Sequence, residues 1–252
     1  MAILNVTPDS FSDGGLFADT DAAVAHGLRL AGEGADILDV GGESTRPGHT
    51  PVSAEIEMAR VLPVVAALVD QAGVPVSIDT MKASIALAAT QAGAKIVNDV
   101  WGLQRDPEMA AVCAGADVDV IVMHNRAAVD PTIAIIDDML AFFERSLAIA
   151  RRAGLADARV TLDPGIGFGK TPAQSLAALR AVPRLKAMGF RVLVGASRKA
   201  VIGYVTGRGV GERLAGTLAT HLWAVRAGAD MIRAHDVAAH RDVLAMWGAL
   251  DG

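Results

Sequence analysis

The sequence predicts an α/β protein that folds as a single (β/α)8 TIM barrel. The chain has 252 residues, a usual length for one such barrel, and 52% of them are hydrophobic, which is enough for a large core. Short apolar runs alternate with longer Ala/Leu-rich stretches of helical character, and this alternation builds parallel sheets covered on both faces. We therefore expect one domain over residues 1–252.

Eight apolar runs are candidate strands, and a turn-like segment and a helical stretch follow each of them. Eight such units favour a closed barrel over an open doubly wound sheet, which gives similar local patterns and stays open as the alternative. The expected strands are Ala2–Val6, Ile37–Val40, Val74–Ile78, Lys95–Val97, Val118–Met123, Val160–Leu162, Arg191–Val194 and Met231–Ala234.

Helical stretches are expected, among others, at Asp21–Gly32, Ser53–Gln71 and Pro131–Ala153. No Pro/Ser/Gly linker or charge block separates a second domain. Glycine in a left-handed conformation commonly ends a helix. Glycines of this kind are expected at Gly32, Gly73, Gly93, Gly154, Gly189 and Gly228.

Composition excludes several classes of protein. The net charge is −5 and there is no run of Lys or Arg, which argues against a nucleic-acid partner. Cys113 is the only cysteine, so an internal disulfide and a multi-thiolate metal site are excluded. The N-terminus carries no basic leader, and no apolar run reaches ~18 residues. These features indicate a cytoplasmic protein without a membrane partner.

A polar residue follows every apolar run. Strand ends of a parallel barrel open on one face, so these side chains are expected to converge on an active-site rim. An aspartate after a strand is also a common helix N-cap, and that alternative stays open for Asp39 and Asp99. The rim candidates are Asn5, Asp39, Asp79, Asn98, Asp99, His124, Asp163, Ser197, Lys199, Arg233 and His235.

The glycine-rich segment after Asp163 is similar to two nucleotide-binding motifs but matches neither. A phosphate-binding P-loop needs glycine where Pro164 stands, and the dinucleotide fingerprint needs glycine or alanine at Lys170. The segment is therefore interpreted as a rim loop behind a carboxylate.

Seven motifs, in order along the chain, resemble the signatures of the dihydropteroate synthase family. That family condenses a dihydropterin pyrophosphate with para-aminobenzoate, releases pyrophosphate and uses Mg²⁺. The motifs are ILNVTPDSFSDGG at Ile3–Gly15, DVGGESTRPG at Asp39–Gly48, SIDT at Ser77–Thr80, VNDV at Val97–Val100, LDPGIGFGK at Leu162–Lys170, SRK at Ser197–Lys199 and RAHDV at Arg233–Val237.

The resemblance implies a pterin pocket made by Asp79, Asn98, Asp163 and Lys199. Asp163 offers two acceptor oxygens, which suit a paired interaction with the amino-pyrimidine edge of a pterin. The alternative for Asp163 is a helix cap, which Pro164 and the glycines after it disfavour.

A pyrophosphate site is expected at Arg233 and His235, which lie two apart on the expected eighth strand and so project to the same side. By resemblance Asn5 joins them as a pyrophosphate contact and as the protein ligand of Mg²⁺, a cation that prefers oxygen ligands. Taken alone, Asn5 would be interpreted as a turn residue.

The aminobenzoate site is expected at the second and seventh loops. Thr45, Arg46, Pro47 and Ser197 can hold its carboxylate together with backbone N–H groups near helix starts. The alternative for Arg46 is a solvated loop charge.

The resemblance also implies the catalytic residues. In the first loop, Thr7–Gly15, Phe11 is expected to exclude water and Asp13 to favour a delocalised pterin cation formed as pyrophosphate departs. Lys199 is the third catalytic candidate. No strong general base is evident for the amine, and a homodimer is implied.

Two features depart from the family pattern. Relatives often carry residues before the first motif, so a truncated N-terminus stays open as an interpretation. The loop Met123–Thr132 lacks a glycine soon after His124, which leaves that histidine without an assigned role. The remaining histidines, His26, His49, His221 and His240, are taken as surface or packing residues.

Three rival functions stay open. Lys199 could form a Schiff base in another barrel enzyme, although its loop position favours a protonated amine. A corrinoid-linked methyltransferase would keep the pterin site but has no use for the pyrophosphate contacts. A pterin-binding paralogue without turnover is the third, and the intact set of site residues disfavours it.

Overall fold

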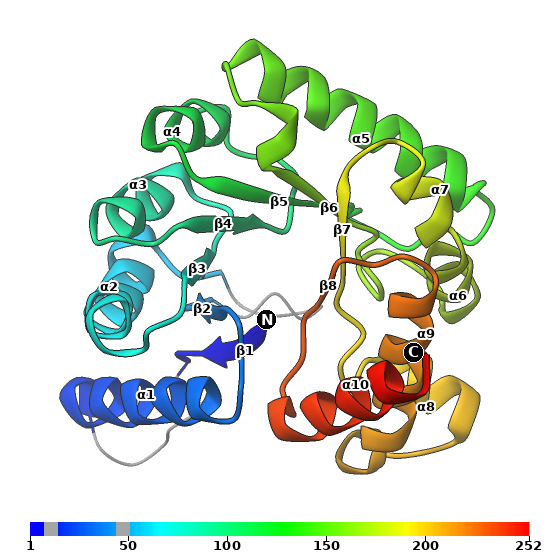
Figure 1. Ribbon diagram of the computed structural model, residues 1–252. Helices are drawn as coiled ribbons and strands as arrows, with labels where there is room; N and C mark the ends of the chain where they lie inside the picture. Colours follow the sequence, from blue (N-terminus) through cyan, green and yellow to red (C-terminus); the bar gives the residue numbers. More distant parts are fainter. Residues whose placement is uncertain (8–14, 44–50, 252) are drawn as a thin grey trace.

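A computed structural model describes residues 1–7, 15–43 and 51–251 of the chain. Within these residues eight parallel strands follow one another around a ring in sequence order, as the colours of Figure 1 show. The strands are β1 Ala2–Asn5, β2 Leu38–Gly41, β3 Val76–Asp79, β4 Ile96–Asp99, β5 Asp119–Met123, β6 Val160–Asp163, β7 Arg191–Val194 and β8 Met231–Ile232.

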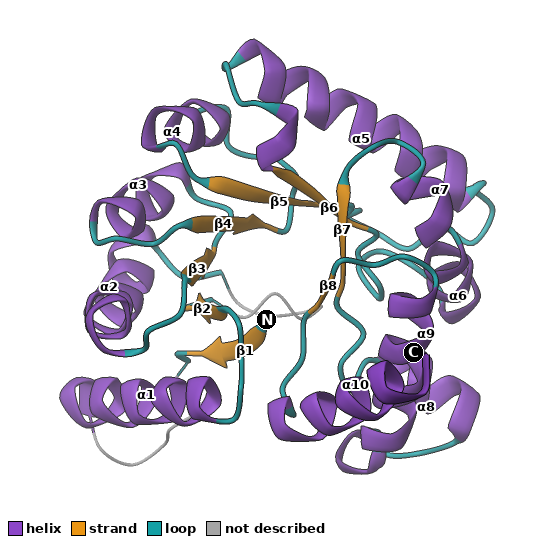
Figure 2. Ribbon diagram, viewed as in Figure 1, coloured by secondary structure: helices purple, strands orange, loops and turns teal. Residues whose placement is uncertain are grey.

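The ring closes just after β8. Ala234 forms a parallel bridge with Ala2. The N–H of Ile3 donates to the carbonyl of Ala234 at 3.0 Å, and the N–H of Ala234 donates to the carbonyl of Met1 at 3.0 Å. Strands form the inner ring and helices the outer one (Figure 2). The predicted (β/α)8 barrel is confirmed, and the open sheet is excluded.

The helices of the outer ring follow the predicted order, with short 3-10 turns at Asp157–Arg159 and Val210–Glu212. Side chains begin some of them: Ser53 accepts from the N–H of Ile56 before α2, and Thr171 and Gln174 form a capping box on α6. The helices are α1 Gly15–Gly32, α2 Ala54–Gln71, α3 Ala83–Gln91, α4 Met109–Ala116, α5 Ile135–Arg152, α6 Pro172–Arg180, α7 Val182–Lys186, α8 Ala200–Thr206, α9 Leu214–Arg226 and α10 Val237–Asp251.

Five of the six predicted glycine stops have positive φ, at Gly73, Gly93, Gly154, Gly189 and Gly228. The predicted end of the helix at Gly32 is confirmed, but the predicted left-handed conformation of Gly32 was wrong. That residue still belongs to α1, and the left-handed residue is Gly34, at φ 96°.

Two apolar layers lie on either side of the strands. The larger packs between the strands and the outer helices, with Leu4, Leu38, Ile78 and Leu162 among its fully buried side chains. The smaller lies inside the barrel, where Ile96, Ile121 and Leu193 from different strands meet. Side chains two residues apart on a strand face the same way. The residues two positions after this inner layer therefore also face the barrel interior, nearer its mouth, where the site lies.

Candidate active site

Arg233 lies at the centre of the barrel mouth, between carboxylates from two strands. Its Nε donates to Asp39 Oδ2 at 2.5 Å, and its Nη2 donates to Asp79 Oδ2 at 2.7 Å. Asn98 Nδ2 donates to the same oxygen of Asp39 at 2.9 Å. Asp39 therefore lies inside β2 as an ion-pair partner and does not cap a helix.

This cluster has unused acceptors. The Oδ1 atoms of Asp39 and Asp79 are buried and have no hydrogen-bond partner within the part of the chain that the structure describes. Burial raises the pKa of Asp79 to about 7, against the opposing effect of Arg233 and with a contribution from Asp39. Two carboxylates share one guanidinium here, so a ligand with N–H donors would relieve the excess of acceptors.

Asp163 has one carboxylate oxygen that no described residue uses. It ends β6 and is 4% exposed. Its Oδ1 accepts from the N–H of Gly165 at 2.7 Å, whereas no described residue donates to its Oδ2. Burial raises the pKa of Asp163, although Lys199 and the Gly165 N–H act in the opposite direction. The side chain is held by one oxygen and presents the other.

Lys199 is the residue that precedes α8, and its amine interacts electrostatically with Asp163. Its Nζ is 4.5 Å from the centre of the Phe168 ring, a cation–π contact. Burial lowers the pKa of Lys199 to about 8, and Asp163 partly offsets that effect. Among the described residues its amine donates no hydrogen bond, so its three N–H groups are available to a ligand.

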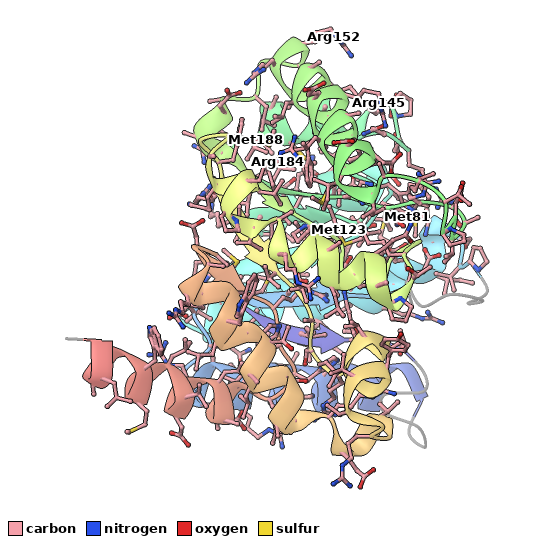
Figure 3. All side chains as sticks on the ribbon, turned by 90° about the vertical axis from the view of Figure 1, so that its right-hand side faces the viewer. Met81, Met123, Arg145, Arg152, Arg184 and Met188 are labelled. Carbon is pink, nitrogen blue, oxygen red and sulfur yellow. The ribbon has the colours of Figure 1, made fainter. Side chains whose placement is uncertain are left out.

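An apolar cluster flanks these polar groups and was not predicted from the sequence. Met81, Val100 and Met123 pack together at the ends of three neighbouring strands, with Phe168 and Trp101 against them. Met81 and Met123 are labelled in Figure 3. Apolar side chains beside directed polar groups are the usual lining of a site for a flat heterocycle.

The loop after β6 is held by a buried lysine. Lys170 is 5% exposed, and its Nζ donates to the carbonyls of Gly165 at 2.8 Å, Phe168 at 3.2 Å and His124 at 3.3 Å. Gly165 has φ 63°, and a Cβ there would lie 1.9 Å from the carbonyl oxygen of His124. The lysine is turned into its own loop, which agrees with the rejection of a phosphate-binding P-loop.

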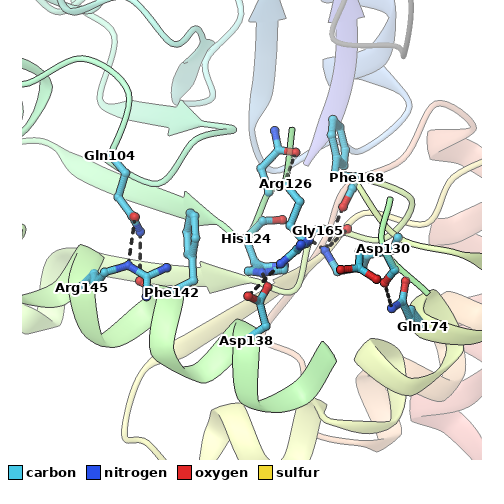
Figure 4. A network of polar contacts seen from close by, with 12 residues as sticks. Gln104, His124, Arg126, Asp130, Asp138, Phe142, Arg145, Gly165, Phe168 and Gln174 are labelled. Atoms are coloured by element: carbon cyan, nitrogen blue, oxygen red, sulfur yellow. Dashed lines mark hydrogen bonds and ion pairs between the residues drawn. The ribbon is translucent and has the colours of Figure 1, made fainter. Parts of the chain in front are cut away.

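His124, which was left without a role, is part of the support for this loop (Figure 4). It is fully buried, its Nε2 lies 3.0 Å from Asp138 Oδ2, and the Phe142 ring packs against it edge-on. Burial lowers the pKa of His124 to about 3. The imidazole is therefore neutral and serves packing between β5 and α5.

Ser197 and His235 meet at the ends of β7 and β8. Ser197 Oγ lies 2.9 Å from His235 Nδ1 and also accepts from the N–H of His235 at 3.2 Å. Both Arg233 and His235 come after the observed end of β8, which is shorter than predicted. The expected grouping thus changes: Ser197 contacts His235, while Arg233 contacts Asp39 and Asp79.

The chain is similar to known proteins over most of its length. The family model described as "Pterin binding enzyme" matches residues 1–235. The dihydropteroate synthase of Clostridium beijerinckii is 47% identical over 94% of this chain and 88% of the relative, and that of Bacillus subtilis is 45% identical over 94% and 83%. The solved Xanthomonas albilineans dihydropteroate synthase in complex with 7,8-dihydropteroate matches at a TM-score of 0.92 and 44% identity, covering 100% of this chain and 93% of that one.

The chain belongs to the dihydropteroate synthase family. This confirms the resemblance and, with it, the class of enzyme, a transferase of folate biosynthesis. A second solved relative, the dihydropteroate synthase from Clostridium difficile in the presence of pteroic acid, has a TM-score of 0.95 at 44% identity and covers 99% of this chain and 95% of that one.

Not every predicted site residue of this family member can be placed. Asp79, Asn98, Asp163, Lys199 and Arg233 come together at the barrel mouth. Asn5 ends β1 at the same rim, next to Gly41 in the register. The remaining predicted residues lie outside those that the structure describes: Phe11, Asp13, Thr45, Arg46 and Pro47.

Two aspartates within strands have structural roles that the sequence left open. Asp39 was ambiguous, although an aspartate in the middle of an apolar strand is itself a signal of a buried partner. Asp99, in contrast, is a backbone cap for its own loop, accepting from the N–H groups of Trp101 and Leu103. No helix in the described part of this chain is long and apolar enough to cross a membrane.

Proposed function

We propose that the chain catalyses the dihydropteroate synthase reaction itself. The C–O bond between the pterin methylene carbon and pyrophosphate breaks, and pyrophosphate leaves with the bonding electrons. The amine nitrogen of para-aminobenzoate then forms the C–N bond and loses a proton. The observation that carries this proposal is the pair of buried, unpartnered acceptors at Asp79 Oδ1 and Asp39 Oδ1. Together with Asp163 Oδ2, which accepts from no described residue, they suit the N–H groups of a pterin.

Each described group has a part in this reaction. Asp163, Asp79 and Asn98 would fix the edge of the pterin ring, while Met81 and Met123 contact its face. Lys199 would donate to the pterin ring next to Phe168. Ser197 and His235 would donate to pyrophosphate and to the carboxylate of the second substrate. A hydroxyl and an imidazole N–H can both donate to such anions, and the two side chains lie next to one another at this rim.

The first two loops carry the rest of the proposal. Phe11 and Asp13 would enclose the cationic pterin, and Thr45, Arg46 and Pro47 would bind aminobenzoate. Replacing Asp13 by Asn is expected to lower turnover much more than it weakens binding of the dihydropterin pyrophosphate. Weaker binding at unchanged turnover would contradict this role.

Mg²⁺ is proposed as the cofactor, with Asn5 as its protein ligand. Asn5 is half-buried at the end of β1, and its amide has no hydrogen-bond partner among the described residues. No group of three His, Cys, Asp or Glu that could hold a metal occurs in those residues. One amide oxygen fits an ion held mainly by water and substrate oxygens. When bound, Mg²⁺ would offset negative charge on pyrophosphate, and Asn5→Ala should raise the Mg²⁺ concentration needed for substrate binding.

A homodimer is proposed as the functional assembly. The outer surface over α8, α9 and α10 exposes large apolar side chains: Tyr204 is 68% exposed, Val205 61%, Trp223 42% and Met246 61%. Such a patch favours a partner surface. Light scattering after size exclusion should give twice the chain mass, and Tyr204→Glu combined with Val205→Glu should give a monomer. A wild-type monomer would refute the proposal.

One assay tests the reaction. Purified protein, dihydropterin pyrophosphate, para-aminobenzoate and Mg²⁺ should release pyrophosphate and form dihydropteroate, detected by mass spectrometry. Omitting any one component serves as the control. Absence of product with all components present, from protein whose unfolding transition shows that it is folded, would refute the proposed function.

A further inference from the structure

Two buried histidines lie behind β7 and β8, outside the groups that the proposed reaction uses. His221, on α9, is 1% exposed, and His240, on α10, is 5% exposed. Neither histidine has a partner that is evident from the sequence. In the structure, His221 Nδ1 and His240 Nε2 lie 2.8 Å apart. The pair joins the two helices directly under the loops that carry Ser197 and His235.

The pair continues into both loops. At one end, the N–H of Ala196 donates to His221 Nε2 at 2.9 Å. At the other, His240 Nδ1 lies 2.6 Å from the carbonyl oxygen of Asp236. Three hydrogen bonds therefore connect the residue before Ser197 with the residue after His235.

Only one placement of protons satisfies this chain. A backbone N–H can only donate, so His221 Nε2 accepts and the ring carries its proton on Nδ1. That proton is donated to His240 Nε2, which is therefore bare. His240 carries its proton on Nδ1, where a carbonyl accepts it. A second proton on either ring would break a hydrogen bond, so both imidazoles are neutral.

Burial supports the neutral state. It lowers the pKa of His221 to about 3, with further lowering by His240, Lys199 and the terminal amine of Met1. Burial also lowers the pKa of His240, against the raising effects of the Asp236 backbone and carboxylate. The described charged groups that act on the pair are thus Lys199, Asp236 and the terminal amine.

The loop after β7 has a second attachment to α9. Thr217 lies one turn before His221, and its Oγ1 accepts from the N–H of Arg198 at 3.0 Å. Arg198 has φ 58°, a conformation that a residue with a side chain adopts only when its surroundings hold it there. His221 and Thr217 thus bind the N–H groups on either side of Ser197.

Asp236 links the loop after β8 directly to the loop after β7. Its carboxylate pairs with the guanidinium of Arg198, with Nε and Oδ2 3.0 Å apart. Ser197 and His235, which contact one another, lie inside this closed set of contacts. Their relative position is therefore fixed from behind as well as by their own hydrogen bond.

We propose that His221 and His240 are positioning residues that hold the β7 and β8 loops together through a fixed pair of Nδ1–H tautomers. The pair keeps Ser197 and His235 in contact. It also orients Lys199, which lies two residues after Ser197 in the same loop. This rests on the proposed function only as far as substrate binding is concerned.

The tautomers can be tested without substrate. Nitrogen-15 NMR of protein labelled at histidine should show two neutral rings that are protonated at Nδ1 and bare at Nε2. In free histidine the Nε2–H form predominates, so this pattern is a specific signature. Protonation of His221 at Nε2, or averaging between tautomers, would overturn the proposal even if the enzyme were active. Substitution of each histidine assigns the signals.

Kinetics test the consequence for the site. In His240→Gln, the amide oxygen can still accept from His221 Nδ1–H, whereas His240→Leu leaves that proton without an acceptor. We expect KM for both substrates to rise about 10- to 100-fold in His240→Leu and to stay within about threefold in His240→Gln, because small displacements of binding groups have effects of this size.

Leu155→Ala is the matched control, since Leu155 is 4% exposed in the main core and lies before β6, remote from these loops. It should lower the unfolding midpoint and leave KM unchanged. Equal KM values in wild type and His240→Leu, or equal losses in the Gln and Leu variants, would overturn the positioning role. If His240→Leu does not fold, the Gln variant and the NMR spectrum still decide. An inactive wild type with the expected tautomers would refute the proposed function alone.

Discussion

Asp99 and Asp163 are two buried aspartates that end β4 and β6 of the same barrel. Their exposed fractions are 1% and 4%, and each accepts from the backbone of the loop that follows it. Asp99 uses both oxygens in this way, at 2.8 Å to the N–H of Trp101 and 2.7 Å to the N–H of Leu103. Asp163 uses one oxygen, on Gly165.

The difference shows what distinguishes a site residue from a structural one in this barrel. Both aspartates end a strand, but only Asp163 retains an acceptor for a ligand. The register places Asp99 level with Val122 and Leu162, which face the outer helices, whereas Asp163 is level with Met123. The lysines repeat the contrast. Lys170 donates to three carbonyls of its own surroundings, whereas Lys199 is held by Phe168 and donates to no described residue.

The largest effect is expected for Asp163→Asn. Its amide group keeps an oxygen for Gly165 but turns a donor toward the N–H groups of the ligand. Lost charge-assisted hydrogen bonds and the opposed donors should lower kcat/KM about 100- to 1000-fold, which corresponds to about 3–4 kcal/mol. The unfolding free energy should change by less than about 1 kcal/mol. Steady-state kinetics and urea unfolding measure the two quantities.

Asp99→Asn should show the opposite pattern. The new amide nitrogen faces one of two backbone donors, and the lost bond should lower the unfolding free energy by about 2 kcal/mol. Burial raises the pKa of Asp99 to about 6, so urea unfolding is measured at pH 7.5, where the carboxylate is ionised. KM for the dihydropterin substrate should stay within about threefold. A loss of substrate affinity equal to that of Asp163→Asn would end the contrast between the two residues.

A third test uses a side chain whose hydrogen bonds are all internal. The pKa of His221 is 6.5 in its unperturbed state and about 3 in the fold. Because the native pKa is lowered, the unfolded chain takes up the proton first, and stability is lost as pH falls from 6.5 toward 3. Between pH 7 and 5 wild type should lose about 2 kcal/mol more than His221→Gln. Parallel urea-unfolding results at pH 7 and pH 5 would contradict the neutral, buried state.

The smallest effect is expected for Lys199→Arg, which tests whether Lys199, unlike Lys170, binds the substrate. With its pKa lowered to about 8 by burial, Lys199 should lose its proton above that pH. If the charged amine binds substrate, kcat/KM of wild type falls about tenfold per pH unit on the alkaline side. Arginine stays protonated, so the variant should lack this limb. A limb that stays at the same pH in the variant would assign it to another group.

The order of strands and the residues at their ends were predictable from the sequence, because alternating apolar and helical stretches fix the topology of a parallel barrel. Side-chain pairing was not. Asp39, Asp79 and Arg233 meet only when three strands close into a ring, and their spacing along the chain carries no trace of that contact. Likewise, His221 and His240 lie on different helices with ordinary spacing. Both pairings depend on rotamers chosen by packing.

The shared guanidinium at the barrel mouth has a consequence for the heat of binding. With its pKa raised to about 7, Asp79 carries a proton in part of the ligand-free molecules at neutral pH. A pterin that donates an N–H to this carboxylate favours its ionised form, so that binding releases a fraction of a proton to the solvent. The enthalpy measured by calorimetry should therefore vary with the ionisation enthalpy of the buffer, and association becomes a proton-coupled equilibrium.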